Sequence, residues 1–175
     1  MNEERCETPV ISLDPALIPR HVAIIPDGNR RWAENHALKL LQGHSYGVDA
    51  VGIAIRTALK LGVRVLTLYG FSTENWRRTE IEVCFLIDLI AKSIRANMEA
   101  LVAEGVRVSA IGMWRELPDH LVDTIEEIQA ATAEGKGLDF VLAINYGGRA
   151  DIVQAARKLA SQAAEGSLDP NSIDE

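Results

Sequence analysis

Four short runs rich in β-branched residues alternate with longer helical patterns, and this alternation limits the possible folds more than any other feature. The strand-like runs span residues 21–26, 63–69, 106–111 and 139–145. The helical patterns span residues 43–61, 79–104, 118–133 and 149–164. Strands joined by helices at this spacing need right-handed crossovers, which produce a parallel sheet. We therefore predict an α/β fold with a central, mostly parallel sheet and helices on both faces.

One domain accounts for almost the whole chain. Residues 1–19 lack a sustained hydrophobic period and contain three prolines, so we predict a flexible N-terminal arm followed by a single domain over residues 20–175. No apolar run approaches the 18 or so residues of a transmembrane helix. Cys6 and Cys84 are too few for a disulfide framework, which favours a reducing, cytoplasmic location, and we expect Cys84 to be a small core residue.

The charge balance restricts the possible ligands. The chain has 18 Lys and Arg against 25 Asp and Glu, a formal net charge of -7. A protein that mainly binds a nucleic-acid backbone would carry the opposite balance, so we predict no nucleic-acid partner. An anionic substrate would have to be bound by a local cluster of basic residues.

The first such cluster follows the first predicted strand, in the segment HVAIIPDGNRRW. A glycine there lets backbone approach a phosphate, and arginines donate paired hydrogen bonds to one. A carboxylate beside a phosphate is favourable when Mg²⁺ bridges the two, so we predict a diphosphate site with Asp27 as a metal ligand. The alternative is a simple turn in which Asp27 is ion-paired. The cluster comprises Asp27, Gly28, Asn29, Arg30, Arg31 and Trp32.

A second cluster lies at the carboxyl end of the second predicted strand. Its hydroxyl and amide groups can bind phosphate or orient a proton, and its indole offers an apolar wall. The alternative is an elaborate helix cap, although Thr79 and Glu82 already match a capping box. The cluster comprises Ser72, Thr73, Glu74, Asn75, Trp76, Arg77 and Arg78.

The third cluster, NYGGR at residues 145–149, again follows a strand. In an open parallel sheet, ligands bind outside the carboxyl ends of the strands, so we predict that the three clusters meet there. His44, near the start of a helix, either joins them or is structural. The predicted basic pocket consists of Arg30, Arg31, Arg77, Arg78 and Arg149.

Two helices indicate an apolar cleft beside this pocket. Residues 83–90 are apolar on nearly every side, which is more than one core-facing stripe requires. The preceding helix is rich in small residues, so the pair either leaves a cleft or packs tightly. Bulky replacements at Ala54 or Ala58 would test the cleft. The small residues are Gly47, Ala50, Gly52, Ala54 and Ala58.

In order and spacing, HVAIIPDGNRRWA, GHSYG, LTLYGFSTENWRR and AINYGGR resemble the cis-prenyltransferase family, which includes undecaprenyl and dehydrodolichyl diphosphate synthases. The resemblance covers residues 19–175 and implies the undecaprenyl diphosphate synthase-like fold. It implies an enzyme that condenses isopentenyl diphosphate with an allylic diphosphate, such as farnesyl diphosphate, to give a cis-polyprenyl diphosphate of the undecaprenyl lipid-carrier type. It also implies Mg²⁺ as cofactor and a cytoplasmic homodimer peripheral to the inner membrane surface.

The resemblance assigns roles to individual residues. Asp27 would act with Mg²⁺ on the diphosphates, and Asn75 would help to remove the proton. The product would grow into a tunnel between the two helices described above. The implied substrate-binding residues are Gly28, Asn29, Arg30, Arg31, Trp32, His44, Phe71, Ser72, Thr73, Glu74, Trp76 and Arg78.

The sequence departs from the family pattern in several places. Pro26 replaces a methionine, Arg30 replaces a glycine common in bacterial members, and Leu40 replaces a phosphate-binding arginine, with Lys39 as a candidate substitute. The chain also ends before the family's R-x-G-E-x-R-x-S-N type motif, so we expect a C-terminally truncated member without its last strands, with a sheet edge left open. Two other functions stay open: a non-catalytic partner subunit or fragment that binds diphosphate, and a Mg²⁺-dependent phosphohydrolase with Asp27 as nucleophile.

Overall fold

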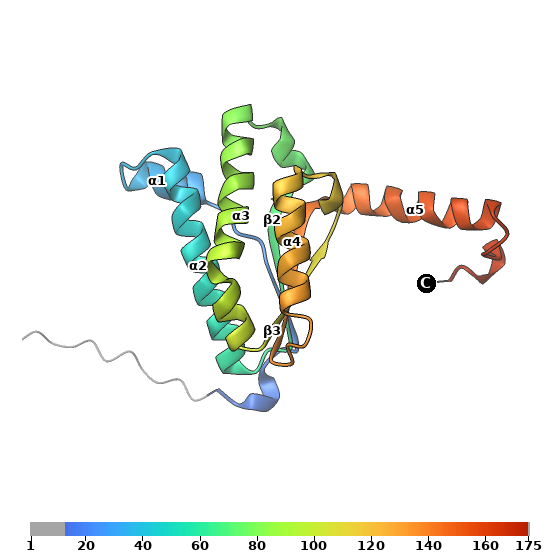
Figure 1. The fold of residues 1–175 in the computed structure, drawn as a ribbon, viewed down its shortest axis with the longest axis horizontal. Helices are drawn as coiled ribbons and strands as arrows, with labels where there is room; N and C mark the ends of the chain where they lie inside the picture. Colours follow the sequence, from blue (N-terminus) through green and yellow to red (C-terminus); the bar gives the residue numbers. More distant parts are fainter. Residues whose placement is uncertain (1–12, 175) are drawn as a thin grey trace, which may run out of the picture.

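A four-stranded parallel sheet in the order β1-β2-β4-β3 forms the centre of the computed structural model, which describes residues 13–174 (Figure 1). The strands are β1 (His21–Ile24), β2 (Val65–Ser72), β3 (Val106–Ile111) and β4 (Leu138–Tyr146). The helices are α1 (Asn29–Asn35), α2 (Leu40–Leu61), α3 (Glu80–Ala103), α4 (Asp119–Ala131) and α5 (Gly148–Ala164). The predicted α/β class and parallel sheet are confirmed, and each predicted strand and helix is present.

The two central strands supply most of the sheet's contribution to the core. Leu66 and Leu68 of β2 lie in register with Phe140 and Leu142 of β4, and all four side chains are buried. Near the carboxyl end of β2 the register shifts between Tyr69 and Phe71, and again before Ser72. Such irregularities redirect side chains at the ends of strands. Here the shift falls directly before the second predicted polar cluster.

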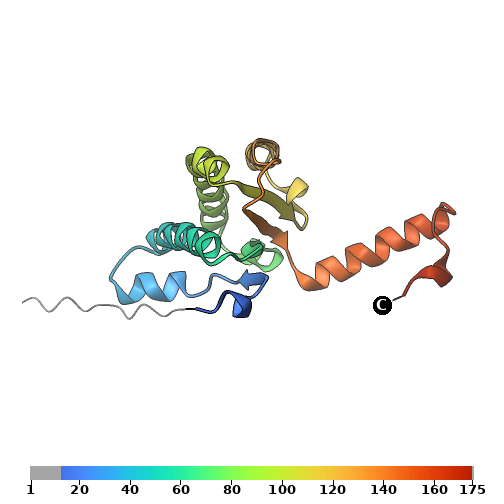
Figure 2. The same ribbon diagram turned by 90° about the horizontal axis from the view of Figure 1, so that it is seen from below.

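Helices α2 and α3 pack side by side against one face of the sheet, and α4 lies next to α3 at the β3 edge (Figures 1 and 2). Side chains of α4 bond to that edge: Thr132 Oγ1 accepts from the Val108 backbone N–H at 3.0 Å, and Gln129 Oε1 accepts from the Ala110 N–H at 3.1 Å. These bonds satisfy two backbone donors of the edge strand β3.

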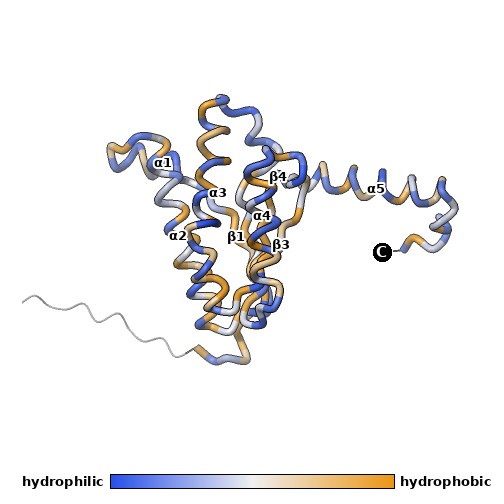
Figure 3. Tube along the Cα trace, viewed as in Figure 1, coloured by the Kyte–Doolittle hydropathy of each residue, from blue (hydrophilic) through white to orange (hydrophobic). Residues whose placement is uncertain are grey.

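Helix α5 extends away from the sheet, as Figures 1 and 2 show. None of its residues is buried, and Figure 3 shows hydrophobic and hydrophilic positions alternating along it. Within residues 13–174, the second face of the sheet therefore has less helical cover than the sequence suggested. The arm predicted over residues 1–19 falls mostly outside the described residues, and its described part contains a short 3-10 helix, Pro15–Leu17.

Three details differ from the sequence-based expectations. Helix α2 begins at Leu40, so Gly43 and His44 lie within its first turns and not at its start. Cys84 is an exposed free thiol on α3 and not a core residue, because its position faces away from the sheet. Thr79 caps α3 by accepting from the Glu82 N–H at 3.4 Å, but the Glu82 carboxylate does not complete a capping box.

Candidate functional site

A cavity of about 730 Å³ opens at the carboxyl ends of β1 and β2 and continues between α2, α3 and the sheet. This volume lies within the usual range for small-molecule sites. Its inner part is lined mainly by aliphatic and aromatic side chains, with Ser93 and Asn97 of α3 as polar exceptions. The aliphatic and aromatic residues are Val48, Val51 and Ile55 of α2, Leu86, Leu89, Ile90, Ile94 and Leu101 of α3, and Leu68, Phe140 and Leu142 of the sheet.

The mouth of the same cavity is polar. Parallel strands end here, which is where an open α/β sheet places its ligands. The first two predicted clusters meet at this mouth, whereas Arg77 and Arg149 of the predicted basic pocket do not line the cavity. The polar residues at the mouth are Asp27, Asn29, Arg30, Arg31, His44, Ser72, Asn75, Arg78, Glu82 and Tyr146.

A second, smaller hollow of about 340 Å³ lies at the opposite, amino ends of β2, β3 and β4. It has no apolar interior like that of the larger cavity, and Arg107 in its wall is already paired with Asp139 at 2.7 Å. None of the predicted site residues lines it, so the chemistry belongs to the larger cavity. Its lining residues are Arg64, Arg107, Gly135, Lys136, Gly137 and Asp139.

The loop from β1 to α1 presents Asp27 to solvent. The side chain of Asp27 is 81% exposed; its Oδ1 accepts from the Gly28 N–H at 2.7 Å, and its Oδ2 accepts from Arg31 Nη2 at 2.9 Å. Gly28 has φ 90°, a left-handed conformation that favours glycine and turns the chain into α1. Asp27 is therefore ion-paired, as the simpler alternative supposed, and it still offers free carboxylate lone pairs at the cavity mouth.

Helix α1 rests directly on two glycines of α2. A Cβ added at Gly43 would collide with the backbone oxygen of Asn29, and one added at Gly47 would lie 2.6 Å from Asn29 Nδ2. Gly47 and Gly52 also line the cavity, so small residues of α2 serve both close packing and the cleft. Neither Ala54 nor Ala58 lines it, which corrects the two positions proposed for bulky replacements.

The second cluster forms a short 3-10 helix, η2 (Thr73–Arg77), between β2 and α3. The Oδ1 atom of Asn75 accepts from the Ser72 N–H at 3.0 Å, which fixes the amide at the cavity mouth. Trp76 points elsewhere: its ring packs edge-on against Phe71 with centroids 5.4 Å apart, and its Nε1 donates to Asn145 Oδ1 at 2.8 Å. Phe71 in turn is buried and lines the cavity.

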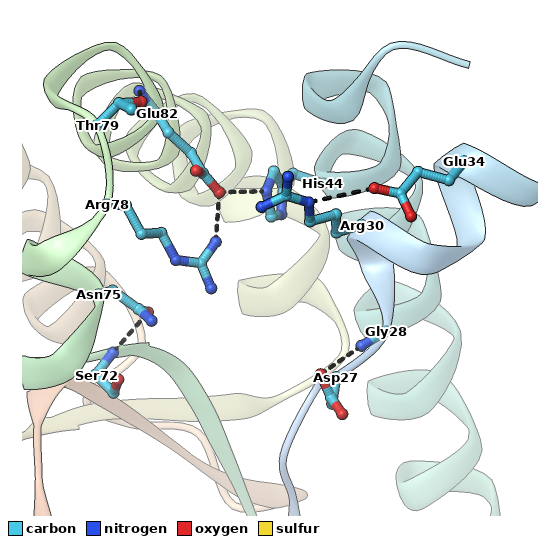
Figure 4. A network of polar contacts seen from close by, with 10 residues as sticks. All are labelled: Asp27, Gly28, Arg30, Glu34, His44, Ser72, Asn75, Arg78, Thr79 and Glu82. Carbon is cyan, nitrogen blue, oxygen red and sulfur yellow. Dashed lines mark hydrogen bonds and ion pairs between the residues drawn. The ribbon is translucent and has the colours of Figure 1, made fainter. Parts of the chain in front are cut away.

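A buried carboxylate joins two elements at the mouth (Figure 4). Glu82 Oε1 accepts from Arg78 Nη1 at 2.6 Å and lies 3.2 Å from His44 Nε2, within hydrogen-bond distance. His44 comes from α2, Glu82 from the first turn of α3, and Arg78 from the end of η2 just before α3. The network therefore ties the two helices together at the polar end of the cavity, and Figure 4 shows it on the side of the mouth opposite Asp27.

The electrostatics of this network favour the charged carboxylate. Burial alone would raise the pKa of Glu82, but the hydrogen bond and charge of Arg78, together with those of His44, outweigh burial and lower it. Across the mouth, Tyr146 donates to Asp151 Oδ2 at 3.1 Å, and this bond raises the pKa of the phenol. Near neutral pH the mouth therefore presents an ionised Glu82 and a neutral Tyr146.

The predicted site residues divide into two groups. Ten of them line the cavity: Asp27, Gly28, Asn29, Arg30, Arg31, His44, Phe71, Ser72, Asn75 and Arg78. Four lie outside its lining: Trp32, Thr73, Glu74 and Trp76. Trp32 stacks on His36 with ring centroids 4.2 Å apart, and Lys39, at the N-cap of α2, also lies outside. The roles of these residues in catalysis stay predictions.

The exposed carboxylate of Asp27 is the protein group at the mouth that could coordinate a magnesium ion. No group of three or more His, Cys, Asp or Glu side chains suitable for a metal occurs within residues 13–174. Mg²⁺ is commonly held by one or two carboxylates together with substrate phosphates and water, so a lone exposed carboxylate is compatible with it. The donor set therefore fits an ion that Asp27 holds jointly with a bound diphosphate.

Glu82 and Tyr146 line the cavity but were not predicted from the sequence as site residues. Glu82 was interpreted only as part of a capping box, although it follows Arg78 by four residues, a spacing at which oppositely charged side chains often pair. Tyr146 belongs to the segment NYGGR, in which only the glycines and the arginine were predicted to contact a ligand. The i,i+4 spacing was a usable signal for Glu82.

Comparison with known proteins gives consistent results. Residues 25–175 match a family model described as "Putative undecaprenyl diphosphate synthase". Curated isoprenyl transferases are similar over most of the chain: that of Prochlorococcus marinus is 45% identical over 94% of this chain, and that of Bacillus subtilis is 46% identical over 90%. The chain spans about 62% and 61% of the lengths of these two relatives.

A solved structure also resembles this fold. The crystal structure of lavandulyl diphosphate synthase from Lavandula x intermedia, in complex with dimethylallyl diphosphate, superimposes with a TM-score of 0.85 at 39% identity. The match covers 89% of this chain and 66% of that one. Sequence and fold thus place the chain beside the same group of proteins.

Proposed function

The chain belongs to the prenyltransferase family of undecaprenyl diphosphate synthases, and we propose that its large cavity joins isopentenyl diphosphate to an allylic diphosphate such as farnesyl diphosphate. The observation that carries the proposal is the division of one cavity into a polar mouth and an apolar interior. A prenyl diphosphate has the same division: an anionic head and a hydrocarbon tail. Burial of the tail would stabilise the complex by about 0.8 kcal/mol for each CH₂ group removed from water.

The two arginines at the mouth, Arg30 and Arg31, would bind the diphosphate head. Their guanidinium groups supply paired donors that match phosphate oxygens. Mg²⁺, when bound between Asp27 and the diphosphate, would neutralise the negative charge that grows as the diphosphate leaves. Binding would also require Arg31 to exchange its contact with Asp27 for one with phosphate. This exchange is inexpensive, because both side chains are mostly exposed.

The reaction breaks the bond between C1 of the allylic group and the diphosphate oxygen. The double bond of isopentenyl diphosphate forms the new bond to C1, and loss of a proton sets the new double bond. The amide of Asn75, held by Ser72, lies at the mouth where that proton would leave. The buried His44, Glu82 and Arg78 network would hold the second diphosphate head in place through Arg78. The growing chain would enter the apolar interior between α2 and α3.

The test is incorporation of labelled isopentenyl diphosphate into organic-extractable product in the presence of farnesyl diphosphate and Mg²⁺. Asp27→Ala should abolish incorporation, whereas Asp49→Ala, which removes an exposed acid of α2 outside the cavity lining, should leave it unchanged. Incorporation that survives Asp27→Ala would contradict the assignment of this residue. No incorporation by the unaltered chain, with farnesyl diphosphate still bound, would instead support a non-catalytic partner or fragment.

The proposal also covers the chain length of the product, the oligomeric state of the protein and its location in the cell. An undecaprenyl-type product, a homodimer and a peripheral position at the cytoplasmic membrane surface rest on the resemblance of the motifs. No helix among residues 13–174 is long and apolar enough to cross a membrane. Analytical ultracentrifugation would test the dimer, flotation with vesicles would test membrane association, and chromatography of the product would test its length.

A further inference from the structure

Asn145, the residue before the last of β4, is held in an unusual conformation. Its φ is 48°, in the left-handed region, and its side chain is 3% exposed. A residue other than glycine adopts this conformation at a cost unless the surrounding contacts maintain it. The end of a strand does not by itself require a buried asparagine with a left-handed backbone, so specific contacts must hold Asn145 in this conformation.

The amide of Asn145 bonds to two segments that are distant in the sequence. Its Oδ1 accepts from Trp76 Nε1 at 2.8 Å, and its Nδ2 donates to the Met113 carbonyl at 2.9 Å. An indole can only donate and a carbonyl can only accept, so the chemistry of the partners determines the orientation of the amide. The backbone oxygen of Asn145 also accepts from the Met113 N–H at 3.2 Å. Both amide groups are satisfied, and the residue links η2 to the loop after β3.

A second contact joins the same segments independently. Gly147, two residues later, packs so closely on Thr73 that an added Cβ would collide with the threonine hydroxyl. Thr73 and Trp76 lie at opposite ends of η2. The turn between β4 and α5 therefore contacts η2 at both ends. Between these two contacts lies Asn75, whose amide faces the cavity mouth.

We propose that Asn145 is a positioning residue: by holding the Trp76 indole, it fixes η2 so that Asn75 and Ser72 keep their places at the cavity mouth. The inference rests on the proposed function and deepens it, because Trp76 itself lies outside the cavity lining. Asn145 would act by positioning other residues and not by contacting the substrate. Misplacement of a reacting group by about 1 Å can cost about 100-fold in rate. We call the hydrogen bond between Asn145 and the Trp76 indole the anchor. Its loss should lower kcat by more than the accompanying loss of folding stability would explain.

Three substitutions distinguish positioning of η2 by Asn145 from a role of Asn145 in packing alone. Asn145→Gly tolerates the left-handed conformation but removes the amide, and Trp76→Phe removes the indole donor. Asn145→Asp retains the acceptor for the indole but loses the donor to the Met113 carbonyl. Thr132→Val is the matched control. It removes another buried polar group, whose Oγ1 accepts from Val108 N and donates to the Ile128 carbonyl, at the β3 edge away from the cavity lining.

The first readout does not depend on activity. The indole N–H signal of Trp76, assigned in nitrogen-15 spectra by its absence in Trp76→Phe, should exchange with solvent at least 10-fold faster in Asn145→Gly. In Thr132→Val the exchange rate should stay near that of the unaltered protein, and in Asn145→Asp, which keeps only the acceptor for the indole, it should be slower than in Asn145→Gly. All measurements are made well below the melting temperature of each variant, so that global unfolding does not contribute. Equal indole exchange in Asn145→Gly and the unaltered protein would overturn the proposal.

The second readout is kinetic. Asn145→Gly and Trp76→Phe should each lower kcat about 100-fold, and the double variant should lose little more than either alone, because both remove the same bond. Asn145→Asp should recover part of the loss, because it keeps the acceptor for the indole but not the donor to the Met113 carbonyl. Fully additive losses would overturn the proposal. If the unaltered protein shows no turnover, the proposed function fails while the indole exchange, and binding of a non-hydrolysable farnesyl diphosphate analogue, still decide the role of Asn145.

Discussion

Glu82 shows how a single residue can organise the mouth of the cavity. Its carboxylate is buried, yet it is ionised because Arg78 donates to it at 2.6 Å and His44 lies within hydrogen-bond distance. Removing one partner of a buried charge leaves the other unsatisfied, which usually costs more than the bond itself contributed. Glu82 therefore affects both the stability of the fold and the orientation of Arg78.

Glu82→Gln should lower the free energy of unfolding at neutral pH by about 1 kcal/mol, a modest value because Arg78 is 37% exposed and water screens the pair. The lowered pKa of Glu82 means that its contribution is complete above the ordinary glutamate value of about 4.3 and disappears as pH falls through the lowered value. Urea titrations of both proteins from pH 7 to pH 3 should therefore converge at the acid end.

Glu99→Gln is the matched control for this titration, since Glu99 is an exposed acid on the same helix. It should unfold like the unaltered protein at every pH. A difference between Glu82→Gln and the unaltered protein that persists undiminished at pH 3 would show that the charge of Glu82 is not its source.

The contact between α1 and α2 sets the position of the β1–α1 loop. Gly43→Ala places a Cβ against the backbone of Asn29, so one helix must move. Overpacking of this kind costs about 1–3 kcal/mol, and for a chain of this size each kcal/mol lowers Tm by about 2–4 °C. We expect a lower Tm by differential scanning calorimetry, and weaker binding of farnesyl diphosphate by titration calorimetry, because Arg30 and Arg31 move with α1.

Gly148→Ala provides the comparison, because a Cβ there meets nothing within 4 Å. At the first position of α5, alanine should leave Tm unchanged or raise it slightly. Equal losses of Tm in Gly43→Ala and Gly148→Ala would indicate that backbone flexibility, and not the contact with Asn29, explains both effects.

The helix α2 offers a direct test of the product tunnel. Val51 lines the cavity, so Val51→Phe should fill part of it and shorten the prenyl chains formed, as read by thin-layer chromatography of the dephosphorylated products. Ile53→Phe changes a side chain on the same helix that is 60% exposed and outside the lining, and it should leave the product distribution unchanged. The same products from Val51→Phe and the unaltered chain would exclude growth into this cavity.

These elements also show what the sequence could and could not predict. Strand positions were accurate to within two or three residues, because buried parallel strands are continuous β-branched runs. The start of α2 was placed three residues late, since a glycine within a helix resembles a boundary until its contact with Asn29 is known. The composition of α2 and α3 left a cleft and tight packing as alternatives, and it did not indicate which residues line the cavity. The rotation of α2 brings Val51 and Ile55 inward and leaves Ala54 outside the lining, and this rotation depends on tertiary packing.

On the scale of the whole molecule, α5 exposes apolar side chains to solvent. Ile152 and Val153 on this helix are 72% and 48% exposed, and exposed apolar surface of this kind commonly marks an interaction site. We expect the sedimentation coefficient to rise with protein concentration, and the double substitution Ile152→Glu and Val153→Glu to reduce this rise.

Ile81→Glu is the appropriate control for sedimentation, since Ile81 is 77% exposed but lies in the first turn of α3. It should not change the concentration dependence. If both sets of substitutions reduce association equally, apolar surface in general drives it and α5 has no special part.

The strand order has a consequence for the way the protein folds during synthesis. Among residues 13–174, β3 pairs with β4 and β1 pairs with β2, and β4, which follows the other three strands along the chain, connects the two pairs. Until residues 138–146 have left the ribosome, β3 has no partner strand and one side of β2 is unpaired. Unpaired strand edges can form non-native pairs with other strands or chains before β4 is available. The wall of the cavity formed by Phe140 and Leu142 can therefore form only after β4 has left the ribosome and paired with β2 and β3.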